Sequence, residues 1–169
     1  MPPPIRAGLV LGFSVAAWTF IMGFTGWYRH PSLLRLFWLV VPMQVGILVW
    51  GLRTTARDSS YLRQVMNGLN ATVLGAMIIF TGSLLFTTVV FPTYFADLEA
   101  LGRDLMAKQG LSPAQIEAAV KAQAPMQTPR ASAMAGAIGT VVTGFLTSLI
   151  AAAFLRRKGG VQRVFFRDS

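Results

Sequence analysis

Four stretches of the chain are almost wholly apolar and contain no Asp, Glu, Lys or Arg. They are Ala7–Tyr28, Leu36–Leu52, Leu69–Phe91 and Ala131–Leu155. A helix rises about 1.5 Å per residue, so roughly 20 apolar residues cross the ~30 Å hydrocarbon core of a bilayer. The pattern predicts an all-α fold, a four-helix transmembrane bundle. We place the spans at about 7–28, 34–52, 69–91 and 131–155, in a single integral membrane domain over residues 1–169.

The second stretch is the shortest, and it contains Pro42. Arg35 and Arg53 flank it, and their long side chains can reach the two membrane interfaces, so a short span stays viable. A proline frees the backbone carbonyl four residues earlier, here that of Trp38. We therefore expect a kink in this span, with Gln44 as a hydrogen-bonding partner in the same region.

Residues 92–130, between the third and fourth stretches, have a helical pattern of their own. Glu99–Arg103 and Asp104–Lys108 are i,i+4 pairs with the acid first, which is the favourable order. Gly110 suits the position after a helix end, and Ser112 with Gln115 matches a capping box that opens a second helix. The pattern predicts a helical hairpin over Tyr94–Gln123.

This hairpin has apolar residues at helical spacing. We expect them to turn toward the membrane or a partner, and they form the candidate partner surface of the protein. These residues are Leu98, Leu101, Leu105, Ile116 and Val120.

Small residues repeat every four positions along the fourth stretch, in two neighbouring rows, and a shorter row lies on the first stretch. Such rows let helices approach closely in lipid. Our preferred interpretation is that the first and fourth spans pack on each other, and the alternative is that the flat face joins copies of the chain. The residues predicted to make helix-packing contacts are Gly8, Gly12, Gly136, Gly139, Thr143, Gly144 and Thr147.

Charge is scarce and segregated between the spans. Only 12% of residues are charged, against about 25% in soluble domains, and 15 Lys and Arg outnumber 6 Asp and Glu. Basic residues concentrate on the cytoplasmic side of membrane proteins. If both termini are cytoplasmic, that side receives nine basic residues, namely Arg6, Arg53, Arg57, Arg63, Arg156, Arg157, Lys158, Arg163 and Arg167.

The opposite side then receives six, namely Arg29, Arg35, Arg103, Lys108, Lys121 and Arg130. This asymmetry predicts cytoplasmic termini and an extracytoplasmic hairpin. It also explains the net charge of +9 without a nucleic-acid partner. The basic cytoplasmic tail, residues 156–169, is expected to contact anionic lipid headgroups through Arg156, Arg157 and Lys158.

No arrangement of side chains typical of catalysis is found in the sequence. The four stretches contain no Asp, Glu, Lys or Arg, so a proton relay of buried carboxylates is not expected. The chain has no Cys and one His, His30, whereas a metal or haem site needs several ligands. We therefore predict no catalytic, metal or cofactor-binding residue, no cofactor, and no enzymatic activity.

Three segments resemble a family of small bacterial four-span membrane proteins catalogued as domain of unknown function 4199. They are the opening Ala7–Gly12, the loop segment Gln109–Glu117, and the end of the last span, Gly144–Lys158. The resemblance covers about residues 5–158. It implies a multi-pass protein of the bacterial inner membrane, and it implies neither an activity nor site residues.

These features favour a non-enzymatic accessory or scaffold component that acts through helix–helix and outer-loop contacts. An alternative is a small permease or channel formed by oligomerisation, with polar residues of the third span along a path. A membrane-embedded enzyme ranks third, because clustered His, Asp and Glu are lacking. Besides membrane lipid, the expected partners are a second copy of the chain or another membrane protein.

Overall fold

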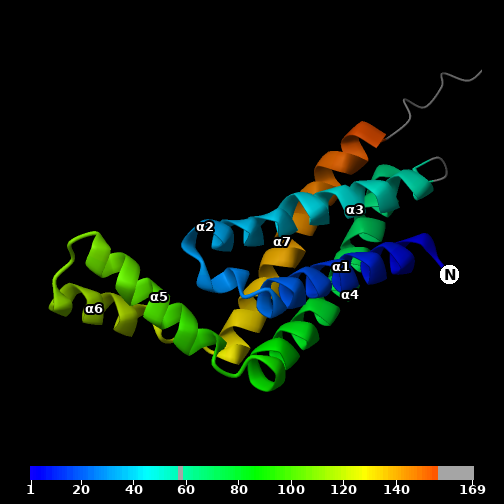
Figure 1. The fold of residues 1–169 in the computed structure, drawn as a ribbon. Helices are drawn as coiled ribbons and strands as arrows, with labels where there is room; N and C mark the ends of the chain where they lie inside the picture. The colour runs from blue at the N-terminus through cyan, green and yellow to red at the C-terminus, as the bar shows by residue number, and fades with distance from the viewer. Residues whose placement is uncertain (57–58, 156–169) are drawn as a thin grey trace, which may run out of the picture.

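The computed structural model describes residues 1–56 and 59–155, and in these ranges the chain forms only helices and loops (Figure 1). The four long helices are α1 (Pro3–Phe24), α3 (Val40–Thr55), α4 (Tyr61–Leu85) and α7 (Pro129–Leu155). The shorter elements are η1 (Trp27–Arg29), α2 (Pro31–Leu34), η2 (Arg35–Leu39), η3 (Phe86–Val90), α5 (Tyr94–Lys108) and α6 (Pro113–Gln123).

Four helical segments are long and apolar enough to cross a membrane, judged by length and composition. They are Pro3–Phe24, Pro31–Thr55, Tyr61–Val90 and Pro129–Leu155. Helices α5 and α6 form a hairpin, hereafter the hairpin, between the third and fourth of these segments. The predicted all-α bundle of four apolar helices with a hairpin is therefore confirmed, while the predicted tail, residues 156–169, lies outside the described residues.

Two span boundaries differ from those that the uncharged runs suggested. Helix α1 ends at Phe24 rather than near Tyr28, because Gly26 adopts a left-handed conformation with φ 69° and a 3₁₀ turn follows. Helix α4 begins at Tyr61, where the Ser60 side chain accepts a hydrogen bond from the Arg63 backbone N–H. Arg63 lies in the first turn of α4, where a long charged side chain can reach the membrane interface. The start predicted at Leu69, chosen because the uncharged run begins there, was therefore too late.

The second span is irregular before Pro42 rather than kinked within a continuous helix. A 3₁₀ segment, η2, leads into α3, and Pro42 lies in the first turn of α3, where a missing N–H costs little. Gln44 does not make the hydrogen bond that was expected near Pro42. It is buried, and its Nε2 donates to the Thr140 carbonyl oxygen of α7 at 2.7 Å.

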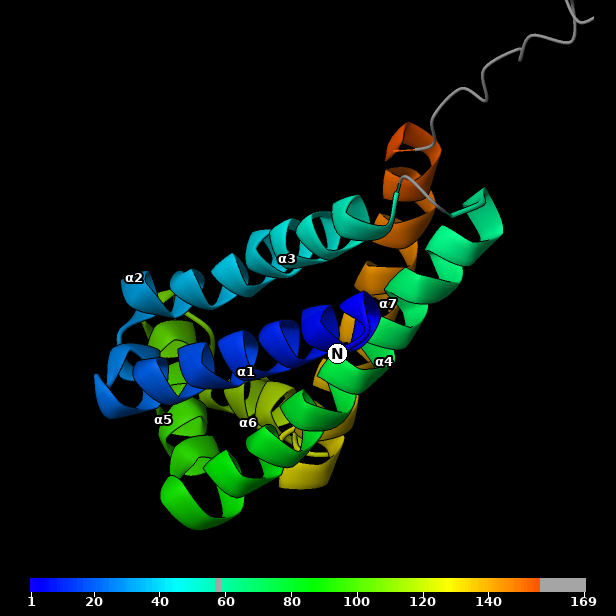
Figure 2. The same ribbon diagram turned by 90° about the vertical axis from the view of Figure 1, so that its right-hand side faces the viewer.

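Helix α4 lies between α1 and α7, and α3 contacts the same two helices on the other side. Figures 1 and 2 show α1 and α3 side by side, crossing α4 and α7. The first and fourth spans, α1 and α7, are not among the helix pairs in extensive contact. Our preferred pairing of these two spans was therefore wrong.

The reason is that α4 carries small residues on two faces. A Cβ at Gly8 of α1 would lie 2.6 Å from the Ala71 carbonyl oxygen of α4. A side chain at Gly144 of α7 would collide with Thr72, one position further along α4, and one at Gly68 would collide with Ser148. The small-residue rows of α1 and α7 therefore both pack on the same middle helix.

Candidate functional site

Aromatic side chains of α1, η1, η3 and α5 meet where the hairpin joins the bundle. Phe86 of η3 is 2% exposed, and its ring centroid lies 4.7 Å from that of Phe91 and 5.2 Å from that of Tyr94. Phe20 of α1 and Tyr28 of η1 extend the cluster, with Tyr28 and Tyr94 centroids 5.0 Å apart. These contacts pack the start of α5 against the bundle.

Backbone features of α1 and η3 make room for this cluster. Gly23 faces the rings of Phe86 and Phe91 so closely that a side chain there would collide with both. η3 is a π-helical segment, closed by a hydrogen bond from the Phe91 N–H to the Phe86 carbonyl oxygen at 2.7 Å. A π-helical turn changes the direction in which side chains leave the helix, and it places Phe86 and Phe91 on the same side.

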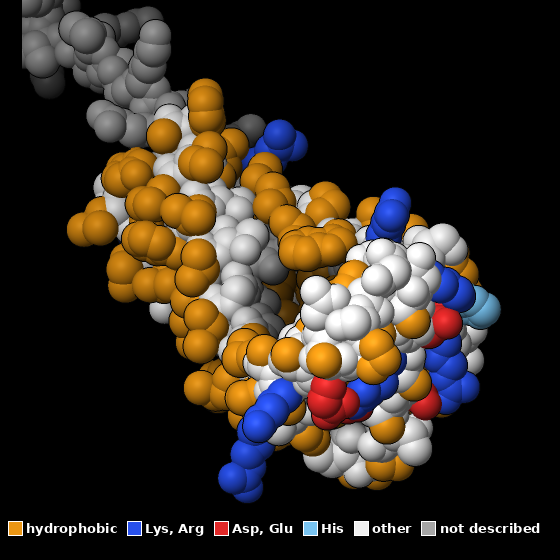
Figure 3. Space-filling view, turned by 90° about the vertical axis from the view of Figure 1, so that its left-hand side faces the viewer, with side chains coloured by type: hydrophobic (Ala, Val, Ile, Leu, Met, Phe, Trp, Pro, Cys, Tyr) orange, Lys and Arg blue, Asp and Glu red, His pale blue; other side chains and the backbone are white. Residues whose placement is uncertain are grey.

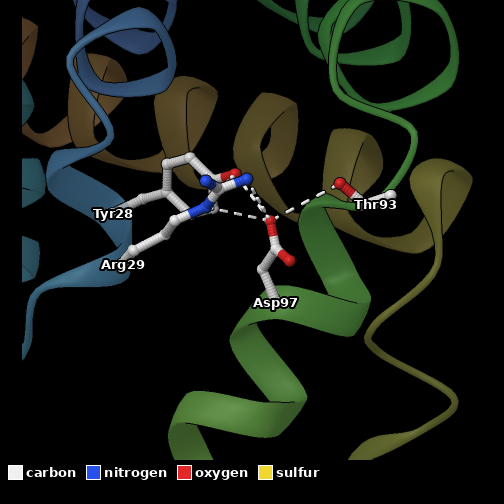
Figure 4. A network of polar contacts seen from close by, with 4 residues as sticks. All are labelled: Tyr28, Arg29, Thr93 and Asp97. Carbon is white, nitrogen blue, oxygen red and sulfur yellow. Dashed lines mark hydrogen bonds and ion pairs between the residues drawn. The ribbon is translucent and has the colours of Figure 1, made fainter.

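A polar network lies beside the aromatic cluster (Figure 4). The Tyr28 hydroxyl donates to Asp97 Oδ2 of α5 at 2.8 Å, and Arg29 donates to the same oxygen from Nη2 at 2.8 Å and from Nε at 3.1 Å. The Thr93 hydroxyl donates to it at 3.5 Å. Because Tyr28 and Arg29 belong to η1, the network fastens α5 to the first loop of the bundle.

The network sets the protonation states of its members. The hydrogen bond from Tyr28, together with the Arg29 guanidinium, holds the pKa of Asp97 below its ordinary value. Burial, followed by the hydrogen bond to Asp97, raises the pKa of Tyr28. The Tyr28 side chain is 2% exposed, while those of Arg29 and Asp97 are 58% and 28% exposed. At neutral pH Asp97 is therefore ionised and Tyr28 is protonated, which is what this donor and acceptor pattern requires.

The hairpin is also held together internally. Arg103 of α5 donates to Glu99 at 2.9 Å and to Glu117 of α6 at 3.0 Å, and Lys108 pairs with Asp104 at 2.6 Å. The turn passes through Gly110 with φ 83°, a conformation that favours glycine. These contacts confirm both predicted ion pairs, and the link between Arg103 and Glu117 adds a connection between the two helices.

The second helix of the hairpin opens with the capping box that the sequence predicted. The Ser112 side chain accepts from the Gln115 backbone N–H, and the Gln115 side chain accepts from the Ser112 backbone N–H at 2.9 Å. Two of the free N–H groups at the helix start are thereby bonded.

Most of the hairpin surface is uncovered. α5 contacts α6 and η1, and no residue of either hairpin helix is buried. Figure 3 shows charged side chains of both signs gathered over this end of the molecule, whereas hydrophobic side chains cover the bundle. The predicted partner-surface residues are all half-buried, namely Leu98, Leu101, Leu105, Ile116 and Val120. Their contact with membrane or partner stays a prediction.

The predicted packing residues of α7 divide into two groups. Gly144 and Thr147 are buried at helix contacts, as are Gly8 and Gly12 of α1. Thr143 is half-buried. Gly136 and Gly139 are exposed, and a Cβ at either would meet nothing within 4 Å. The part of the small-residue face nearest the hairpin is therefore open in the single chain.

The potential metal ligands among the described residues are dispersed. Within residues 1–56 and 59–155, no three His, Cys, Asp or Glu side chains lie together so that they could hold a metal ion. His30 is exposed and precedes α2. The one carboxylate of the Asp97 network is already bonded to Tyr28 and Arg29, so the network attaches α5 to the bundle.

The contact of Tyr28 and Arg29 with Asp97 was not predicted from the sequence. One indication of this contact was present in the sequence, a pair of opposite charges. Arg29 directly follows an apolar run, and Asp97 lies in the first turn of α5. However, Tyr28 and Asp97 are 69 positions apart, and helical spacing says nothing about a contact across that separation.

The family model described as "Protein of unknown function (DUF4199)" matches residues 6–157. No curated protein and no solved structure matches the chain. The matched range includes the hairpin and nearly all of the four apolar segments. The chain therefore belongs to the DUF4199 family, proteins of unknown function.

Proposed function

We propose that the protein is a non-enzymatic accessory or scaffold component of the bacterial inner membrane, acting through contacts of its hairpin and its helix faces. The supporting observation is that the hairpin is fastened at one end and otherwise uncovered. Tyr28 and Arg29 hold Asp97, whereas no residue of α5 or α6 is buried. A surface held in one orientation loses little conformational freedom on binding, which favours recognition by a partner.

The proposal includes an orientation in which both termini are cytoplasmic and the hairpin is extracytoplasmic. Its support is the excess of basic residues in the segments that adjoin the termini. At the end of the bundle where α1 begins and α7 ends, hereafter the terminal end, the basic side chains Arg6, Arg53 and Arg63 lie near the helix ends. Arg156, Arg157 and Lys158 follow α7, outside the described residues, and we propose that they contact anionic headgroups.

A photo-crosslinking amino acid at Ala114 tests the contact function. Ala114 is exposed on α6, and Met77, which is exposed on α4, is the matched position on a membrane-spanning helix. In membranes of the native host, we expect the probe at Ala114 to give one discrete adduct, close to one partner per chain, and the probe at Met77 to give none of the same mass.

The adduct must also depend on the orientation of the hairpin. Asp97→Asn weakens the anchor, and Asp104→Asn is the matched control because it removes only the surface pair with Lys108. We expect the first variant to lose most of the adduct and the second to keep it. An adduct that forms equally well in both variants, or from both probe positions, would refute recognition by an anchored hairpin.

One observation favours the alternative of an oligomeric permease or channel, namely the open face of α7 at Gly136 and Gly139. The polar residues of the third span give it less support. The hydroxyls of Thr81, Thr87 and Thr88 each donate to a backbone carbonyl four residues earlier, as expected for structural hydroxyls in a membrane helix. A homo-oligomer in mild detergent without a foreign partner would favour this alternative over the contact function.

A further inference from the structure

A groove of about 360 Å³ lies between α3 and α7 near the terminal end. Most of its lining is apolar, and the hydroxyl of Thr147 is already bonded to the Thr143 carbonyl oxygen at 2.7 Å. The groove therefore suits a hydrocarbon chain rather than a polar solute. Its lining includes Val45, Val49 and Arg53 of α3 and Thr147, Ala151 and Phe154 of α7.

Arg53 gives one end of this groove a positive charge. It is exposed in the last turn of α3, and it is not part of any ion pair among the described residues. Arg6 of α1 lies against the neighbouring Trp50 of α3, with its guanidinium 5.4 Å from the ring centroid. Exposed tryptophans mark the headgroup level of a membrane, so these two arginines lie where lipid phosphates lie.

We propose that this groove binds one acyl chain of an anionic phospholipid, and that Arg53 binds the phosphate group of the same lipid. A guanidinium offers two parallel N–H donors to a phosphate, and the side chain needs no movement of the helix to do so. This inference does not depend on the function proposed for the hairpin, because the groove lies at the other end of the bundle.

The charge and the shape together favour a phospholipid over other occupants. A second copy packed on this groove about a two-fold axis along the membrane normal would place its own Arg53 at the same membrane depth, on the other side of the same contact. Like charges at such a contact repel. A free phosphate would use Arg53 but would leave the apolar part of the groove without a role.

Native mass spectrometry of the full chain in mild detergent tests the proposal, with phosphatidylglycerol and phosphatidylcholine titrated separately. Both lipids carry a phosphate that Arg53 can bind, but the trimethylammonium group of phosphatidylcholine offsets that negative charge and repels the guanidinium. For the wild-type chain we therefore expect one lipid to bind with about a tenfold preference for phosphatidylglycerol. Arg53→Gln should abolish most of this preference. Arg53→Lys should retain part of it, because the charge remains without the paired donors.

Two further variants separate the groove from the charge. Val49→Phe fills the groove and should weaken binding of both lipids, whereas Val41→Phe, at an exposed position of the same helix, should not. Arg35→Gln, at the opposite end of the second span, is the charge control and should leave the preference intact.

Three results would overturn the lipid site. The first is equal binding of the two lipids by the wild-type chain, and the second is an unchanged preference in Arg53→Gln. The third is that inorganic phosphate displaces phosphatidylglycerol equally well from the wild type and from Val49→Phe, which would show that the groove does not hold the lipid. Because Arg53 is exposed, its variants should fold, and thermal unfolding in detergent verifies this.

Discussion

At the residue scale, one carboxylate oxygen joins the hairpin to the first loop of the bundle. Asp97 Oδ2 accepts hydrogen bonds from Tyr28 and Arg29, which belong to a different loop. An isolated ion pair between exposed side chains contributes little to the stability of the fold. Here the Tyr28 ring is buried among aromatic neighbours, so its hydroxyl is fixed in position before it meets the carboxylate.

Asp97→Asn should loosen the attachment of α5, because the charge that Arg29 and Tyr28 recognise is lost. The pKa of Asp97 is lowered from its ordinary value of 3.8, so its stabilising effect is fully present above that pH. The effect disappears as the pH falls through the lower pKa of the folded state. Hydrogen exchange across residues 94–108 measures this in nanodiscs.

We expect wild-type protection of these residues to fall at acid pH toward the level of the Asn variant, which should itself change little with pH. Tyr28→Phe should resemble Asp97→Asn. Identical protection in wild type and both variants at neutral pH would show that the aromatic cluster alone holds the hairpin.

The glycines of α7 make a second comparison at the residue scale. Gly144→Leu places a side chain where Thr72 already lies, and overpacking of this kind costs about 1–3 kcal/mol. Gly139→Leu meets open space in the single chain. Thermal unfolding in detergent should show a clear loss for Gly144→Leu and almost none for Gly139→Leu. A loss at Gly139 that grows with protein concentration would instead identify that face as a contact between copies.

At the element scale, the hairpin was the part best predicted from the sequence. Its two i,i+4 ion pairs join neighbouring turns, and its cap lies within four residues, so helical spacing is sufficient to find them. The pair of Arg103 with Glu117 joins the two helices, and it was not predicted. The same spacing shows which face of α1 or α7 carries small residues, but it does not show which helix packs on that face. Because α4 has small residues toward both neighbours, the pairing could be found only from the structure.

The turn between α5 and α6 tests the hairpin as an element. Gly110→Ala forces an alanine into φ 83°, which costs about 1 kcal/mol, whereas Gly102→Ala lies within α5 and removes a flexible residue from a helix. A Cβ at either position meets no neighbour within 4 Å. Hydrogen exchange of residues 94–123 should therefore speed up in the first variant and slow down in the second. The same response to both changes would contradict the left-handed turn.

At the scale of the whole molecule, the membrane-spanning part and the hairpin have different surfaces. Four apolar segments could cross a bilayer, and the hairpin that projects from one end of them carries charges of both signs (Figures 1 and 3). We propose separate roles for these parts, in which the bundle holds the hairpin in place and the hairpin contacts a partner.

The proposed orientation predicts which positions an impermeant thiol reagent can reach in intact cells. The chain has no cysteine, so single substitutions are labelled without background. Cysteine at Ala114 of α6 should react, and cysteine at Thr54, near the terminal end of α3, should react only after the cells are opened. The reverse pattern would place the termini outside.

The most direct test of the central claim, that the hairpin is held in one orientation on the bundle, is a distance between two spin labels. Ala118 of α6 and Gly46 of α3 are both exposed, and a side chain at Gly46 meets open space, so both can be replaced by cysteine and labelled. Pulsed electron resonance in nanodiscs should give a single narrow distance distribution for this pair. In the Asp97→Asn background the distribution should broaden, while Asp104→Asn should leave it narrow. A broad distribution in the otherwise wild-type chain would contradict the account.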